Sequence, residues 1–108
     1  MFLELFEKDQ IVLLGFVYQE LLSGIRHQEQ FEKVSNALDG FDIQYADKVD
    51  HQTAAQYFNI CRSGGVQGSN IDFLICAMST NRGYSILSLD QDFESYAKHL
   101  PIKLLKPR

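Results

Sequence analysis

Three acidic residues in separate segments of the chain have side chains suited to metal binding: Glu20, Asp72 and Asp90. Glu20 lies one turn into the helix that follows an apolar strand, Asp72 stands at the start of an apolar helix, and Asp90 directly follows an apolar strand. This placement brings all three to one edge of a predicted sheet. Carboxylate oxygens are the ligands that Mg²⁺ and Mn²⁺ prefer. One or two such ions can activate water and stabilise the oxyanions of phosphodiester cleavage. The pattern therefore predicts an oxygen-ligand metal site with hydrolytic chemistry.

Glu20 and Asp72 also have ordinary structural explanations. An acid such as Glu20 in the first turn of a helix is usually a partner of the helix dipole. Asp72 stands near the start of the apolar segment IDFLICAMST, and it could cap that helix, although Ser69 and Asn70 offer caps of their own. A carboxylate among apolar neighbours needs a cation or several hydrogen-bond donors. Asp72 is thus the harder of the two to explain structurally.

Asp90 follows the last strong apolar segment, and Asp92 stands two residues further on. We expect Asp92 to cap a helix that begins at Phe93. Asp90 has no such structural role in the sequence. Both acids are candidate metal ligands, with Asp90 the catalytic candidate.

Other catalytic arrangements lack support. Cys61 and Cys76 have no zinc-ligand spacing and are predicted to be buried thiols. His27, His51 and His99 are scattered over polar faces, so we expect them at the surface. No glycine-rich phosphate-binding motif is found.

Alternating apolar segments predict an α/β fold with a largely parallel sheet and helices on both faces. Residues 1–108 have the length of a single domain. Residues 2–8 are predicted to be the end of an amphipathic helix. The predicted strands are 11–14, 41–45, 84–89 and 101–105, and the predicted helices are 16–25, 31–38, 49–62, 71–80 and 93–96.

The bulk properties are those of an ordinary folded protein. The net charge of −4 argues against a surface that wraps nucleic acid, but a metal-loaded carboxylate site still attracts phosphate. Basic residues crowd the C-terminal end, where Lys98 and Lys103 are either solvated or weak contacts for RNA phosphates. No membrane segment or signal peptide is predicted, so we expect a cytoplasmic protein without membrane contact.

Three stretches in order, VYQELLSG, IDFLICAMS and ILSLDQDF, resemble the motifs of PIN-domain proteins. They are most similar to the VapC-type ribonuclease toxins of bacterial toxin–antitoxin pairs. The resemblance covers the chain from about Asp9 to Leu105. It implies Mg²⁺- or Mn²⁺-dependent endonucleolytic cleavage of RNA. It also implies a cognate antitoxin that lays an amphipathic segment in a hydrophobic groove.

The resemblance also implies roles for individual residues. Glu20 matches the acid of the family's E-L-L-x-G motif, and Asp72 matches the acid that opens the buried helix. Asp90 matches the acid after the late strand, where Ser88 stands in the place of a frequent threonine and could orient a ligand or a water. Asp92 resembles a supporting or capping acid that could also bind metal.

One part of the family pattern is missing from the sequence. PIN domains begin with a central strand that ends in an aspartate, and nothing before Ile11 matches it. We therefore expect an N-terminally incomplete PIN-like domain, through a truncated piece, a misplaced start site or a natural remnant. A missing central strand would leave unpaired backbone groups and favour a homo-oligomer. It would also weaken metal binding.

Two alternatives stay open. A catalytically inactive PIN module could act by binding an antitoxin or by self-association, and the missing aspartate favours it. A phosphoacceptor receiver-like domain has the same α/β layout, but its paired acids after a first strand and its late lysine are not visible.

Overall fold

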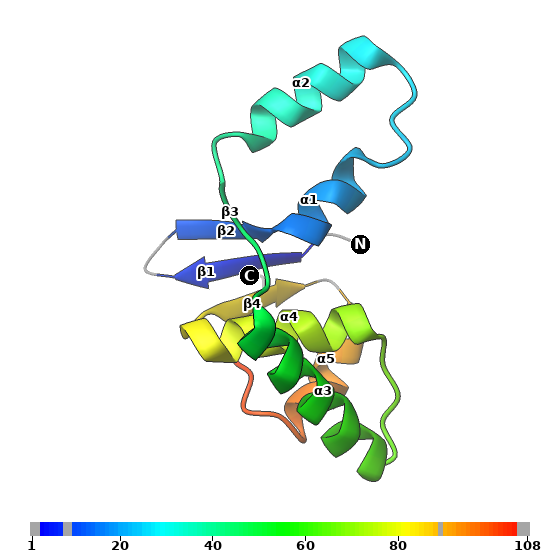
Figure 1. Cartoon of the computed structure of the whole chain (residues 1–108), viewed down its shortest axis with the longest axis vertical. Coiled ribbons are helices and arrows are strands. Elements are labelled where there is room, and N and C mark those ends of the chain that lie inside the picture. Colours follow the sequence, from blue (N-terminus) through cyan, green and yellow to red (C-terminus); the bar gives the residue numbers. More distant parts are fainter. Residues whose placement is uncertain (1–2, 8–9, 89, 106–108) are drawn as a thin grey trace.

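The computed structural model describes residues 3–7, 10–88 and 90–105, with side chains described from Val12 onward. Helices and strands alternate through most of the chain (Figure 1). In chain order they are β1 (Leu3–Glu7), β2 (Gln10–Leu14), α1 (Gly15–Leu22), α2 (Gln28–Leu38), β3 (Asp42–Gln44), α3 (Lys48–Ser63), α4 (Asn70–Arg82), β4 (Ser85–Ser88), α5 (Asp92–Ala97) and β5 (Leu104–Leu105).

The strands form one sheet in the order β3-β2-β1-β4-β5. β2 pairs parallel with β3, and β4 pairs parallel with β5, whereas β1 is antiparallel to both of its neighbours. Apart from β1, the described strands therefore run in the same direction. This confirms the predicted α/β fold with a largely parallel sheet.

The prediction of a helix at the start of the chain was wrong. Residues Leu3–Glu7 form a strand, while residues 2 and 8 of the predicted helix lie outside the described residues. Leu3-Glu4-Leu5 alternates apolar and polar residues, which is the period of a strand. The helix was predicted from the helical spacing of the apolar residues alone. In the fold, β1 pairs with β2 on one side and β4 on the other, which satisfies the backbone groups of both.

The expected gap in the middle of the sheet is filled by β1. The register places Leu3 beside Ser88 and Glu7 beside Gln10. Because β1 is antiparallel, its carboxyl end lies at the opposite edge of the sheet from the carboxyl ends of β2 and β4. β1 therefore occupies the central position without bringing a strand-ending acid to that edge. The expectation of a sheet left open at this position was wrong.

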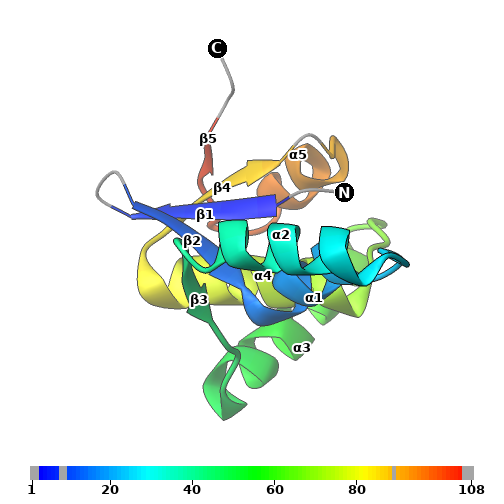
Figure 2. The ribbon, with the colours of Figure 1, turned by 90° about the horizontal axis from the view of Figure 1, so that it is seen from above.

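The helices lie at two ends of the sheet. Figure 1 shows α1 and α2 beside β2, and α3, α4 and α5 on the β4 side. Seen from above, α5 lies across the strands from α3 and α4 (Figure 2). The core joins the buried residues of β2 to the apolar face of α4, which is buried over most of its length as predicted.

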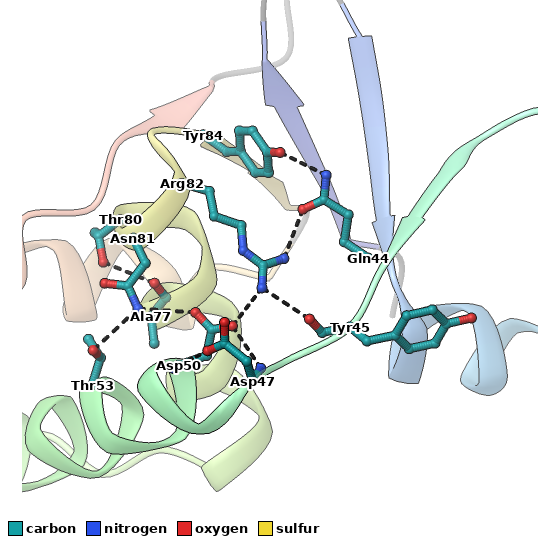
Figure 3. Close-up of polar contacts among 10 residues, drawn as sticks. All are labelled: Gln44, Tyr45, Asp47, Asp50, Thr53, Ala77, Thr80, Asn81, Arg82 and Tyr84. Carbon is teal, nitrogen blue, oxygen red and sulfur yellow. Dashed lines mark hydrogen bonds and ion pairs between the residues drawn. The ribbon is translucent and has the colours of Figure 1, made fainter.

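A polar network joins β3 to α3 and α4 (Figure 3). The carboxylate of Asp50 is 2% exposed and accepts hydrogen bonds from Arg82 Nη2 at 2.6 Å and Asn81 Nδ2 at 3.0 Å. Arg82 Nη1 also donates to Gln44 Oε1 at 2.8 Å, and Gln44 Nε2 donates to the hydroxyl of Tyr84 at 2.8 Å. The network thus holds the β3 end of the sheet against the helices that carry Asp50 and Arg82.

Asp50 also completes a capping box at the start of α3. Its amide donates to Asp47 Oδ1, and the Asp47 amide donates to Asp50 Oδ2. Burial on its own would raise the pKa of Asp50, but the Asp47 amide, Asn81 and Arg82 together hold that pKa below its ordinary value. The Asp50 carboxylate is therefore kept charged inside the protein.

Candidate metal centre

Three of the predicted acids meet at one place in the fold. Carboxylate oxygens of Asp72, Asp90 and Asp92 all lie within 4.8 Å of one another. Asp72 comes from the first turn of α4, Asp90 from the connection after β4, and Asp92 from the start of α5. Asp72 is 7% exposed, Asp90 is half-buried and Asp92 is exposed. The group therefore runs from the interior to the surface.

Asp72 is positioned by its helix and by one tyrosine. Ser69 caps α4, because its hydroxyl accepts a hydrogen bond from the Asp72 amide at 3.1 Å, which leaves the Asp72 carboxylate free of a capping role. The buried hydroxyl of Tyr96 donates to Asp72 Oδ2 at 2.7 Å. Tyr96 was not predicted from the sequence, because a contact between residues 24 positions apart leaves no local pattern.

Asp90 is held by a tight turn. Its amide donates to Ser88 Oγ at 2.9 Å, and its Oδ1 accepts a hydrogen bond from the Asp92 amide at 2.9 Å. The predicted capping role of Asp92 was wrong. α5 begins at Asp92 itself, and the side chain that meets its amide belongs to Asp90, because an aspartate readily bonds the amide two residues ahead.

The three carboxylates lie close enough together to repel one another. The neighbouring Asp90 carboxylate raises the pKa of Asp92, and burial and Asp72 add to the effect. Within the described part of the chain, none of the three carboxylates forms an ion pair with Lys, Arg or His. A bound divalent cation would offset this repulsion, and three carboxylates that include a buried one fit the oxygen ligands of Mg²⁺ or Mn²⁺.

Tyr96 stays a hydrogen-bond donor. Burial raises the pKa of its hydroxyl, and the hydrogen bond to Asp72 raises it further. The neutral phenol therefore fixes one oxygen of Asp72 and leaves the other oxygen available to a ligand.

Glu20 does not belong to this group. It is exposed on α1 and lies outside the set of converging acids found among the described residues. The helix-dipole explanation for Glu20 was also wrong, because α1 begins at Gly15 and has no acid in its first turn. In this structure Glu20 therefore neither lies with the three converging acids nor interacts with the dipole at the start of α1.

The two lysines proposed for phosphate contacts lie at different places. Lys98 follows α5 directly, whereas Lys103 lines a cavity with Ser79 and Gly83 at the far end of α4. Along α4 that end is about 16 Å from Asp72, at the rise of an α-helix. Lys103 is thus remote from the carboxylates, and Lys106 and Arg108 lie outside the described residues.

The cysteine and histidine predictions are confirmed. Cys61 and Cys76 are free and buried, and burial raises the pKa of both thiols, so neither is a ready nucleophile. His27, His51 and His99 are exposed.

The sequence was compared with known protein families and with curated proteins. The sequence model of the PIN domain matches residues 2–99. A search of curated proteins found no match. Among the described residues, no helix combines the length and the apolar character needed to cross a membrane.

Proposed function

Because this chain belongs to the PIN-domain family, whose members are generally nucleases with metal-binding acidic residues, we propose that it is a Mg²⁺- or Mn²⁺-dependent endoribonuclease. The observation that carries the proposal is the convergence of Asp72, Asp90 and Asp92 within 4.8 Å. A bound cation would relieve the repulsion in this group, and a divalent cation can activate the water and stabilise the charge in phosphodiester hydrolysis.

Each residue of the site would have its own role in metal binding. Asp72 and Asp90 would hold the ion, with Asp92 as the exposed third ligand. When bound, the ion supplies an activated water and neutralises charge on the phosphoryl oxygens. Tyr96 fixes one oxygen of Asp72, and Ser88 fixes the turn that aims Asp90. Glu20 remains a proposed further ligand on the strength of the E-L-L-x-G resemblance.

The finer proposal is a cytoplasmic toxin of the VapC type with a cognate antitoxin. It is supported by the resemblance of VYQELLSG, IDFLICAMS and ILSLDQDF to the toxin motifs. A homo-oligomer was expected from an open sheet, and that argument no longer holds because β1 fills the gap. Light scattering of the purified chain measures the oligomeric state directly.

The second candidate is a catalytically inactive PIN module that binds an antitoxin or a second copy. One observation favours it: the central strand β1 is antiparallel, and no aspartate occurs in residues 1–8. β1 ends in Glu7 at the edge of the sheet opposite the carboxyl ends of β2 and β4, so this strand brings no strand-ending acid to the edge where those strands end.

The decisive experiment is cleavage of a labelled structured RNA with added Mn²⁺. We expect Asp72→Asn to abolish cleavage, because it removes a buried charged ligand. Asp39→Asn is the matched control, since Asp39 is exposed at the end of α2, outside the carboxylate group. Calorimetric titration with Mn²⁺ and thermal unfolding of each protein accompany the assay.

The outcomes separate the two candidates. Cleavage by the wild type and Asp39→Asn but not by Asp72→Asn supports the ribonuclease. Mn²⁺ binding without cleavage of any RNA supports the inactive module. A folded wild type that neither binds Mn²⁺ nor cleaves rules out the metal centre altogether.

A further inference from the structure

A small cavity opens between the end of α3 and the loop that precedes α4. Its volume is about 240 Å³, below the roughly 300 Å³ at which pockets for drug-sized ligands begin. It therefore suits a single ring system. The lining residues are Phe58, Arg62, Val66, Gln67, Gly68 and Phe73.

The walls of this cavity are aromatic. The rings of Phe58 and Phe73 lie edge to face, with centroids 5.6 Å apart and an angle of 79° between their planes. A planar ring placed against such walls gains stacking and edge contacts. Phe58 is only partly buried, so a face of its side chain is accessible to an occupant.

One hydroxyl connects the cavity to the carboxylate group. Gly68 lies so close to Tyr96 that a Cβ at position 68 would come within 2.5 Å of the tyrosine oxygen. The same oxygen donates its proton to Asp72, and Phe73 is the next residue after Asp72. A ring in the cavity would therefore be a close neighbour of the candidate metal centre.

The cavity lining and the neighbouring end of α3 offer groups that bind phosphate. Arg62 is exposed and forms no ion pair within the described residues. The imidazole of His99 lies over Gly64, two residues beyond Arg62, where a Cβ would be 2.5 Å from its Cε1. Lys98, next to His99 in the chain, is also exposed. An aromatic cavity with an exposed arginine in its lining complements a planar ring joined to a phosphate.

We propose that this cavity binds one nucleobase of a single-stranded RNA and so positions the chain at the carboxylate group. The ring packs against Phe58 and Phe73, and Arg62 and His99 contact the backbone phosphate. The identification of the ring as a nucleobase rests on the proposed ribonuclease function. The alternative occupant, an apolar side chain of a partner protein, would have no use for an arginine in the lining.

The test separates the base from the phosphate. Binding of a fluorescent 2′-O-methyl RNA hexamer is measured by anisotropy in EDTA, so that no cleavage takes place. An abasic hexamer of the same length serves as the comparison. We expect the base-containing hexamer to bind about 5- to 150-fold more tightly, the range of stacking one base on an aromatic side chain.

Variants locate the binding. Phe58→Leu, and Val66→Phe as a second variant that fills the cavity from the loop, should weaken binding of the base-containing hexamer without affecting the abasic one. Arg62→Gln should weaken both hexamers, by an amount that shrinks as salt is raised. Arg26→Gln is the matched control, an exposed arginine outside the lining of the cavity. Thermal unfolding confirms that each variant is folded.

Amide chemical shifts supply the second readout. Perturbation of Val66, Gln67 and Gly68 by the base-containing hexamer supports the proposal. Equal binding of both hexamers, or shifts elsewhere only, overturns it. Shifts at these amides with N-acetylphenylalanine amide but not with RNA also overturn it and assign the cavity to a protein side chain. Base binding that persists in Asp72→Asn without any wild-type cleavage would reject the ribonuclease alone.

Discussion

At the scale of single residues, the chemistry depends on how each carboxylate is held. Asp72 is buried and has one oxygen fixed by Tyr96, whereas Asp92 is exposed and crowded by Asp90. A buried, pre-oriented ligand loses little freedom when an ion binds. Tyr96 is thus a positioning residue for the metal centre.

Replacing Tyr96 by Phe should weaken Mn²⁺ binding about 10-fold or more, the usual effect of losing a hydrogen bond to a metal ligand. Calorimetric titration with Mn²⁺ measures it. Tyr57→Phe is the matched control, since its hydroxyl also makes one hydrogen bond, to Thr80 at 2.7 Å, away from the carboxylates. Equal Mn²⁺ affinities in the two variants would show that the Tyr96 hydroxyl only stabilises the fold.

At the scale of elements, the unusual feature is β1. A strand between β2 and β4 must pair with both, and the antiparallel direction follows from a connection of only two residues between Glu7 and Gln10. Parallel neighbours need a crossover of a dozen or more residues. The direction of β1 is therefore dictated by the length of chain available.

The pairing of β1 can be measured by NMR. We expect backbone cross-strand contacts of Leu5 to Val12 and to Ile86, together with slow exchange of the β1 amides. The parallel pair Leu13 and Ile43 is the internal reference. Fast exchange in β1 beside slow exchange in β2 and β4 would contradict the five-stranded order.

At the scale of the whole molecule, the network around Asp50 and Arg82 joins the β3 end of the sheet to the helices. Asp50 has a pKa lowered in the folded state, so its contribution to stability is fully present above the ordinary aspartate pKa of about 3.9. It is lost as the pH falls through the lower, folded-state value.

Wild-type protein should therefore lose more stability than Asp50→Asn as the pH is lowered from 5 towards 3, roughly the range around and below the ordinary value. Urea unfolding at several pH values gives the comparison. Asp39→Asn, an exposed substitution, should retain the wild-type slope. If Asp50→Asn and the wild type have parallel profiles, Asp50 does not carry the acid sensitivity.

The sequence by itself determined much of the fold and part of the site. Apolar segments of strand and helix length predicted β2, β3, β4, β5 and the five helices, because burial follows local periodicity. Asp72 and Asp90 could be identified as neighbours, since each adjoins the carboxyl edge of the sheet through a short local connection.

Only the tertiary structure decided the rest. The pairing of β1 with β4, the hydrogen bond from Tyr96 to Asp72 and the ion pair between Arg82 and Asp50 all join residues far apart in the chain. Such contacts form because burial leaves polar groups that must find partners, and the nearest partner in space leaves no periodic pattern in the sequence. The position of Glu20 outside the carboxylate group was likewise set by where α1 begins and lies.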